Sequence, residues 1–232
     1  EIIVVNDESK DSTLQIAMDY SKKHPNIRVL DKKNGGVGAA RNSGLDLAVG
    51  KYVYFLDPDD FLAQNVLRKL LNTIEKYDLD ILTFKSLQFK TEVSKKSKNI
   101  DEISDAKLQP QDGISYIAER KFKNEIWWFI TNREFLIESG IRFIEGRWME
   151  DAILAAELFC KAKKMAHFDL DVHRYRILPN SAMRNKSREH YNKVIFDNAN
   201  AAHVYNDLIQ TIPASHQQSK QCINRLRTRQ QS

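Results

Sequence analysis

Residues 52–60 read YVYFLDPDD, five apolar or aromatic residues followed by three carboxylates in four positions. The apolar run predicts a buried strand of an α/β sheet. Side chains alternate along a strand, so Asp57 and Asp59 are predicted to face the same way at its carboxyl end, where open α/β sheets bind ligands. Like charges at about 4 Å repel by roughly 1 kcal/mol in water, so a cation is expected to offset them.

The cation best suited to this stretch is a hard divalent ion. Two or three carboxylate oxygens bind Mn²⁺ or Mg²⁺ well when phosphate oxygens supply the remaining ligands. Asp60 could instead cap the following helix, but Asp57 lies outside the cap position. In a phosphatase, Asp57 would attack phosphorus and Asp59 would act as acid and base.

The order of predicted elements indicates the fold class. Strands predicted at 1–5 and 27–31 precede the strand at 52–56, and helices at 12–21 and 39–48 separate the three. Such short connections indicate right-handed crossovers and an α/β fold, a Rossmann-like, mostly parallel sheet flanked by helices. We expect further helices at 61–77 and 150–164, and strands at 80–84, 127–130, 165–170 and 172–177.

Polar groups also follow the first two strands. Asn6 and Asp7 come directly after the first strand, and the carboxylate of Asp7 can accept the N–H of a base or a ribose hydroxyl. The glycines of NGGVG, at 35, 36 and 38, allow close backbone approach and positive φ. Arg41 lies in the following helix, from which it can reach a phosphate or serve as a surface residue.

Composition limits the class of protein. The chain has 232 residues, 42% of them hydrophobic, which suits one α/β domain with a helical appendage. No stretch approaches the ~20 apolar residues that span a bilayer. The two cysteines, Cys160 and Cys222, lack metal-ligand spacing and fit a reducing cytosol. We therefore expect a cytoplasmic protein.

The net charge of +5 is concentrated at one end of the chain. From residue 184 to 232, eight Lys or Arg stand against three acids, which accounts for the whole of that charge. We predict a basic helical C-terminal extension over 184–232, which is either a solvated tail or a contact with the anionic inner face of a membrane. Nucleic acid is not expected as a partner, because the arginines are not interleaved with aromatic residues.

Three stretches together resemble a known family. They run in order over most of residues 1–183, and the resemblance is to family 2 glycosyltransferases of the A-type fold. The stretches are EIIVVNDESKDST (1–13), KNGGVGAARNSGLDLAVGKYVYFLDPDD (33–60) and RFIEGRWMEDAILAAELFCKAKKMAHFDLDVHRYRILPNSAM (142–183). The resemblance implies a nucleotide-sugar-dependent glycosyltransferase domain over 1–183.

The resemblance also implies site residues. Asp7 corresponds to the carboxylate that binds the nucleobase. Asp57 and Asp59 correspond to the Asp-x-Asp motif that holds the donor diphosphate through Mn²⁺ or Mg²⁺, beside Arg41 as a phosphate contact. Asp151, in the Glu-Asp pair near the acceptor, corresponds to the general base.

Three residues are predicted at the acceptor. Glu150 precedes the base, and Trp148 lies three residues before it, where an aromatic face can stack on a sugar. Trp127 and Trp128 are predicted to alternate between the two faces of a strand, so one of them belongs to the core and Trp128 is a further acceptor candidate. His173 is interpreted as a structural histidine.

The predicted reaction is an inverting, metal-dependent transfer of a sugar from a UDP-sugar to an acceptor hydroxyl. The acceptor is expected to be a glycan or lipid-linked molecule of bacterial surface polysaccharide synthesis. A non-catalytic domain of the same fold is the main alternative. NGGVGAAR (34–41) resembles the phosphate loop of sugar-phosphate nucleotidyltransferases, but that loop and the phosphatase nucleophile strand normally open their domains, whereas these stretches come later.

Two departures from the family accompany the resemblance. Residues 6–9 read NDES, where the family more often has two aspartates and then glycine, and the chain begins at what corresponds to the second strand. An apolar strand at 2–5 that lacks its neighbour exposes a hydrophobic edge. We expect residues 1–232 to be poorly soluble and to bind UDP more weakly than a chain longer by roughly 30 residues, about one βα unit.

Overall fold

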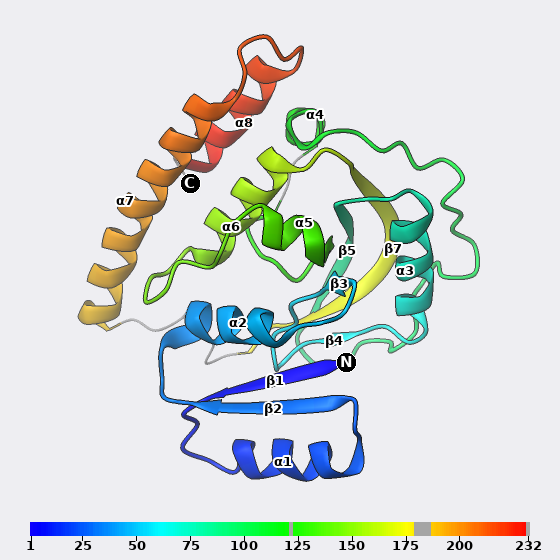
Figure 1. The fold of residues 1–232 in the computed structure, drawn as a ribbon, viewed down its shortest axis with the longest axis vertical. Helices are drawn as coiled ribbons and strands as arrows, with labels where there is room; N and C mark the ends of the chain where they lie inside the picture. Colours follow the sequence, from blue (N-terminus) through cyan, green and yellow to red (C-terminus); the bar gives the residue numbers. More distant parts are fainter. Residues whose placement is uncertain (121–122, 179–186, 231–232) are drawn as a thin grey trace.

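The computed structural model describes residues 1–120, 123–178 and 187–230 (Figure 1). The first third of the chain follows the predicted order β-α-β-α-β. The described elements are β1 (Ile2–Asp7), α1 (Thr13–Lys23), β2 (Ile27–Lys32), α2 (Gly36–Leu47), β3 (Tyr52–Val53), β4 (Phe61–Leu62), α3 (Val66–Lys76), β5 (Ile81–Phe89), α4 (Gly113–Glu119), β6 (Phe129–Asn132), α5 (Arg133–Glu138), α6 (Glu150–Lys161), β7 (Met165–Arg176), α7 (Arg188–Thr211) and α8 (Ser219–Gln230).

The strands form two sheets. β1 and β2 pair in parallel, with Ile2 opposite Ile27 and Asp7 opposite Lys32, and α1 and α2 lie on opposite sides of this pair (Figure 1). The larger sheet has the order β3-β6-β5-β7-β4. Its long pairing, β5 with β7, is parallel, whereas its short pairings are antiparallel. The predicted α/β class is confirmed. The long pairings, β1 with β2 and β5 with β7, are parallel, and the larger sheet is mixed.

The acidic stretch differs from its prediction in local structure. The strand predicted at 52–56 ends at Val53, and the backbone N–H of Asp60 donates to the carbonyl of Asp57 at 3.1 Å. Residues 57–60 therefore form a β-turn, which Pro58 at its second position favours. The prediction that Asp57 and Asp59 share a strand face is wrong, because the chain has left the strand before it reaches them.

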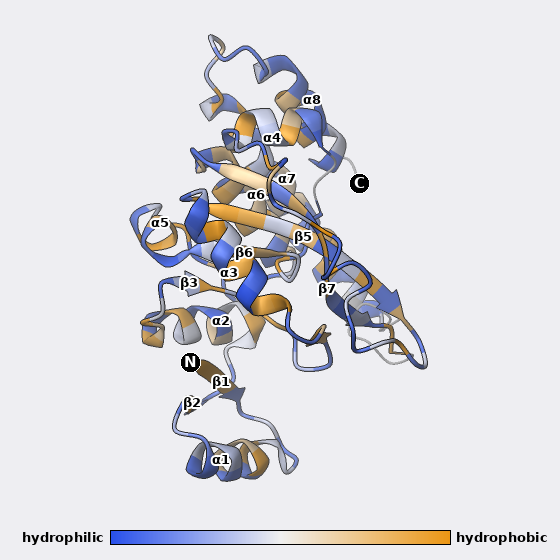
Figure 2. Ribbon diagram, turned by 90° about the vertical axis from the view of Figure 1, so that its right-hand side faces the viewer, coloured by the Kyte–Doolittle hydropathy of each residue, from blue (hydrophilic) through white to orange (hydrophobic). Residues whose placement is uncertain are grey.

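The helix predicted at 61–77 also begins later. Phe61 and Leu62 pair with β7 instead, and α3 starts at Val66. Within α3 the apolar positions Val66, Leu70 and Ile74 are fully buried, four residues apart as in the predicted helix. They pack on one face of the larger sheet, and Figure 2 shows the apolar residues of its strands between the helices.

The C-terminal helices share the main core. Tyr205 on α7 and Cys222 and Leu226 on α8 are buried in the same cluster as α4 and α6. A helical remainder interrupted near Pro213 is confirmed, since α7 ends at residue 211 and α8 begins at residue 219. The predicted boundary at 183/184 lies outside the described residues, as do residues 184 and 186 of the basic tail. Within the described ranges, no helix is long and apolar enough to cross a membrane.

Candidate active site

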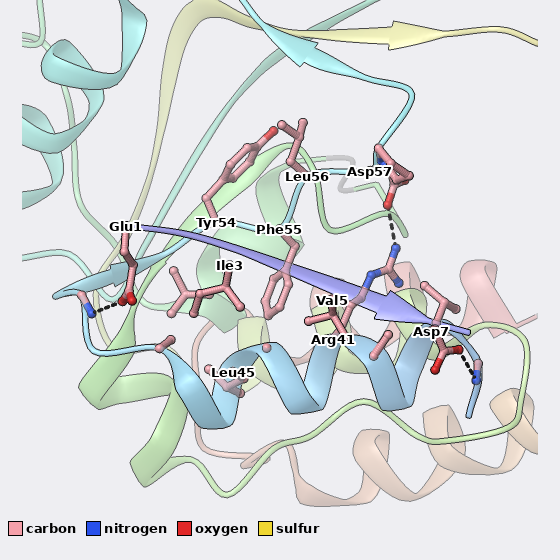
Figure 3. Close-up of a pocket in the computed structure, with 18 of the residues that line it drawn as sticks. Glu1, Ile3, Val5, Asp7, Arg41, Leu45, Tyr54, Phe55, Leu56 and Asp57 are labelled. Atoms are coloured by element: carbon pink, nitrogen blue, oxygen red, sulfur yellow. Dashed lines mark hydrogen bonds and ion pairs between the residues drawn. The ribbon is translucent and has the colours of Figure 1, made fainter. Parts of the chain in front are cut away.

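A groove of about 640 Å³ runs between β1, α2 and residues 52–58. Apolar side chains of β1 and of residues 52–58 line most of its length, as Figure 3 shows. Asp7, Arg41 and Asp57 gather at the end where β1 finishes (Figure 3). Among the described strands β1 pairs only with β2. The groove has a polar end and a long apolar wall.

Arg41 lies at the centre of the polar end. Its Nη2 donates to Asp57 Oδ1 at 2.9 Å, and its Nη1 donates to Glu150 Oε1 at 2.9 Å and to Asp151 Oδ1. The guanidinium also lies over the ring of Phe143, 5.4 Å from its centroid. One cation on α2 therefore serves three carboxylates from two other segments, the turn at residues 57–60 and the start of α6.

The charges of this cluster do not balance. Burial, followed by the nearby charges of Glu150 and Asp57, raises the pKa of Asp151 to about 8, although Arg41 acts to lower it. Burial acts to lower the pKa of Arg41, but Asp151, Asp57 and Glu150 outweigh it and raise that pKa above its ordinary value. With this raised pKa, Asp151 changes between its protonated and ionised forms near neutral pH.

α2 holds the segment before α6 in place. Asn42, which is buried, donates from Nδ2 to the carbonyl of Phe143 and to Glu145 Oε1, both at 2.9 Å. Its Oδ1 accepts the N–H of Phe143 at 3.0 Å. A Cβ on Gly38 would lie 2.5 Å from the carbonyl oxygen of Ile144. The close crossing of these two segments aims α6, with Asp151 in its first turn, at Arg41.

Asp7 organises the glycine loop. Its Oδ1 accepts from Lys32 Nζ and from the N–H of Gly35, both at 3.0 Å, and its Oδ2 accepts the N–H of Gly36 at 2.8 Å. Burial acts to raise the pKa of Asp7, but these hydrogen bonds outweigh it and hold the pKa below its ordinary value. Gly36 has φ 83°, which suits glycine. Asp7 is thus an ionised residue that fixes the start of α2.

Asp60 and Asp59, the two remaining acids of the turn, lie in different surroundings. Asp60 Oδ1 accepts the N–H of Arg176 at 2.7 Å, and Oδ2 lies 3.1 Å from Nε2 of the fully buried His173 without hydrogen-bond alignment. Asn65, not Asp60, is the N-cap of α3, so the cap alternative for Asp60 is wrong. Burial, with Asp60 and Asp57 nearby, raises the pKa of Asp59.

Asp57 and Asp59 form the candidate divalent-cation site. No group of three or more His, Cys, Asp or Glu suited to a metal occurs among the described residues. The two carboxylates nevertheless fit Mn²⁺ or Mg²⁺, because burial and then the neighbouring acids raise the pKa of Asp59 and so destabilise its charged form. Such ions also take most of their ligands from substrate phosphates and water. The predicted metal ligands lie within one β-turn.

The predicted acceptor residues are spread over different places. Glu150 belongs to the Arg41 cluster. Trp148 is half-buried in the segment before α6, and its backbone N–H donates to Asp197 Oδ2 at 2.8 Å. Both Trp127 and Trp128 are buried, at 4% and 3% exposed. Burial weighs against Trp128 as a stacking platform, and the acceptor roles stay predictions.

Sequence reasoning missed the residues that hold the site together. Asn42 and Gly38 were part of a recognised glycine stretch, but nothing in their neighbourhood pointed to residues 143–145. Lys32 faces Asp7 because β1 and β2 pair in register, with Asp7 opposite Lys32. An acid shortly after the first predicted strand and a lysine directly after the second are the only signal in the sequence for that pair.

The chain belongs to glycosyl transferase family 2, whose family model matches residues 1–154. This confirms the family resemblance. Among curated relatives, the chain is 27% identical over 230 residues to the uncharacterized glycosyltransferase YibD of Escherichia coli K12, an alignment that covers 94% of this chain and 67% of YibD.

Two further proteins extend the comparison. The minor teichoic acid biosynthesis protein GgaB of Bacillus subtilis is 43% identical over 82 residues, 35% of this chain and 9% of GgaB. Among solved structures, residues 1–349 of S. aureus TarS in complex with UDP-GlcNAc share the fold, with a TM-score of 0.75 and 20% identity over 99% of this chain and 63% of that one. The chain thus spans about two thirds of the length of YibD and of the TarS chain.

Proposed function

We propose that this chain is the catalytic domain of an inverting glycosyltransferase that moves a sugar from a UDP-sugar to an acceptor hydroxyl. One observation carries the proposal: Arg41 binds both Asp57, in the acidic turn, and Asp151, at the start of α6. A donor-side carboxylate and a candidate base are thereby fixed in one cluster. The complexes of TarS with UDP and UDP-GlcNAc support a UDP-linked donor.

Asp151 acts as the general base in this proposal. A base is most effective when its pKa lies near the working pH, and the pKa of Asp151 is raised to about 8. It accepts the proton of the acceptor hydroxyl as that oxygen attacks the anomeric carbon from the side opposite the diphosphate. A single displacement of this kind inverts the anomeric configuration.

The donor is held by the polar end of the groove. Asp7 faces the base and ribose, while Asp57 and Asp59 would hold Mn²⁺ or Mg²⁺ against the diphosphate. When bound, the cation stabilises the negative charge that develops on the leaving diphosphate. Arg41 keeps Asp57 and Asp151 at a fixed separation, and it carries the counter-charge for both.

The other candidate functions explain fewer of these contacts. A phosphatase in which Asp57 attacks phosphorus gives no reason for Arg41 to link Asp57 to Asp151. In a nucleotidyltransferase the N–H groups of Gly35 and Gly36 would bind phosphate, yet Asp7 accepts both. A non-catalytic domain gives no reason for burying Asp151 beside two further acids. No second function is proposed.

The acceptor is proposed to be a glycan or lipid-linked molecule of bacterial surface polysaccharide synthesis, as the relationship to GgaB suggests. A site at the cytoplasmic face of the membrane fits such an acceptor. Tyr191, Ile195 and Phe196 of α7 are 67%, 55% and 74% exposed. The neighbouring helix α8 carries four Lys or Arg and no acid, and exposed apolar residues beside basic ones suit an anionic bilayer surface.

Vesicle sedimentation tests the membrane contact. Full-length protein should bind anionic vesicles more than neutral ones, and Ile195→Ser with Phe196→Ser should reduce that binding. Ile16→Ser is the matched control, because Ile16 on α1 is also 53% exposed. Equal loss of binding in the control variant would contradict a specific role for α7.

A donor screen tests the activity itself. Full-length protein with Mn²⁺ and a set of UDP-sugars should release UDP from one of them, and NMR of the product should show the opposite anomeric configuration. Tight UDP binding without release of UDP from any sugar, in the presence of bacterial glycan acceptors, would favour the non-catalytic alternative.

A further inference from the structure

A second pocket, of about 300 Å³, lies between the β5–β7 pair and the end of α4. It is separate from the groove described above, and the two share no lining residue. The side chains that matter for its chemistry are Lys85, Ser86, Arg120, Lys123, Trp128 and His167.

The pocket is lined by cations and by no carboxylate among the described residues. Arg120 lies over the ring of Tyr116, 6.0 Å from the centroid, and Lys123 lies over the ring of Trp127 at 5.2 Å. In the described part of the chain, aromatic rings rather than acids are the close partners of these two cations. Burial lowers the pKa of Lys123, against the opposing charge of Glu125, which is the behaviour of an ammonium group without a close counter-ion.

The other two basic groups share one acid at the rim. Lys85 Nζ lies 2.7 Å from Asp169 Oδ2, and His167 Nε2 lies 3.6 Å from Asp169 Oδ1. Asp169 is itself 63% exposed in its side chain. Asp169 therefore neutralises Lys85. Burial, followed by the charge of Arg120, lowers the pKa of His167 below its ordinary value, so the positive charge of the pocket comes from Arg120 and Lys123.

Trp128, which lines the pocket, also has a buried neutral donor. Trp128 is 3% exposed, and its indole Nε1–H has no hydrogen-bond partner in the described structure. A buried donor without a partner destabilises the fold, and a bound ion or water is one explanation for such a group in a native structure. A small anion in the pocket would lie close to the ring of Trp128 and to the side chains of Arg120 and Lys123.

We propose that this pocket binds a phosphate group, as inorganic phosphate or as a phosphate ester. Arg120 supplies the planar donor pair that suits phosphate oxygens. Lys123 supplies a positive charge for which a bound anion would be the counter-ion. Ser86, which also lines the pocket, is bonded through its Oγ to His173 Nδ1 at 2.8 Å. His173 Nε2 lies 3.1 Å from Asp60 Oδ2 without hydrogen-bond alignment, so the phosphate pocket lies two side chains away from the acidic turn.

The test is a titration of the full chain followed by NMR of the tryptophan indole N–H groups. The chain has three tryptophans, so Trp128→Phe identifies the resonance of Trp128. Inorganic phosphate should shift this resonance saturably. Arg120→Gln and Lys123→Gln should each weaken phosphate binding about tenfold or more, since charge-assisted hydrogen bonds contribute about 1.5–3 kcal/mol. Glycerol phosphate and a glycerol phosphodiester, titrated in parallel, distinguish free phosphate from esters.

Lys76→Gln is the matched control. Lys76 also lies over an aromatic ring, 5.0 Å from the centroid of Tyr77, but outside the pocket, so its loss should leave phosphate binding unchanged. The proposal is overturned if phosphate causes no saturable shift, if the two pocket variants bind as wild type does, or if UDP displaces the phosphate. UDP binding by the same variants, measured calorimetrically, reports on the donor site separately.

Discussion

Asp57 and Asp151 are bound to the same guanidinium, that of Arg41, although α3, α4 and most of the larger sheet separate them in the sequence. This shared contact joins the turn that would hold the donor diphosphate to the residue that would deprotonate the acceptor. The charge balance and the backbone packing around Arg41 determine how the site should respond to substitution.

Replacing Arg41 should move the titration of Asp151. The charge of Arg41 acts to lower the pKa of Asp151, so in Arg41→Gln the pKa should rise and less of the base is ionised at pH 7. The acid limb of the kcat/KM profile of the full-length enzyme should therefore move to higher pH. Turnover at pH 7 should fall by about tenfold for each tenfold loss of the ionised base.

Arg41→Lys separates charge from geometry. A lysine keeps the positive charge but cannot donate to several carboxylates through a planar fork. The acid limb should therefore return toward that of the wild type while kcat stays reduced. An unchanged acid limb in Arg41→Gln would show that Arg41 does not control the ionisation of Asp151.

The pH dependence of stability has a defined sign. The ordinary pKa of an aspartate is 3.8, and in the folded protein that of Asp151 is raised to about 8. Between these two values the folded state binds more protons than the unfolded state, so Asp151 makes the free energy of unfolding fall as pH rises. The contribution of protonated Asp151 to the free energy of unfolding is fully present below pH 3.8. It is lost as the pH rises through the raised pKa of about 8.

Asp151→Asn should remove this dependence. The melting temperature of the variant, relative to wild type, should be higher at about pH 8.5 than at about pH 5, by about 2–4 °C per kcal/mol for a chain of this size. Thermal unfolding at the two pH values measures it. Parallel melting curves for the two proteins across this range would contradict a raised pKa.

Two glycines of α2 make a matched pair. Gly38→Ala places a Cβ 2.5 Å from the Ile144 carbonyl oxygen, whereas Gly44→Ala meets Val5 Cγ2 at an ordinary 3.4 Å. Gly38→Ala should destabilise the protein and reduce turnover, because the segment before α6 must move. Gly44→Ala should be neutral or stabilise by up to about 1 kcal/mol through helix propensity. Equal melting temperatures would contradict the role of Gly38.

Metal dependence is tested through Asp59. Asp59→Asn should weaken Mn²⁺-dependent UDP binding by full-length protein at least about tenfold, and EDTA should reduce wild type to the same level. Asp78→Asn is the control, because Asp78 is an exposed acid that pairs with Lys164 away from the groove. Transfer that survives thorough chelation would remove the metal from the proposal.

Much of the fold followed from local patterns. The apolar run at 2–5 and the four-residue spacing of Val66, Leu70 and Ile74 each report on burial of one short segment, and the structure has these elements. The end of the strand at Val53 was missed, because residues 54 and 55 are also half-buried but form no ladder. Hydrophobic patterns report burial, not pairing.

For the site too, local motifs predict which residues are present but not which residues they contact. Asp7, Arg41, Asp57 and Asp151 are predicted as site residues from their motifs, and the structure brings the last three together. That Arg41 contacts carboxylates rather than open solvent could not be foreseen, because the partners lie 16 and 110 positions away. The crossing of α2 with residues 143–145, through Asn42, holds the segment that leads to Asp151 close to Arg41.

Turnover by Asp151→Asn in the full-length enzyme tests the central claim most directly. With a UDP-sugar donor and Mn²⁺, kcat should fall by about 10²–10⁴-fold, the usual contribution of a general base. UDP affinity, measured by calorimetry, should stay near that of the wild type. A variant that keeps nearly full turnover would contradict the assignment of Asp151 as the base.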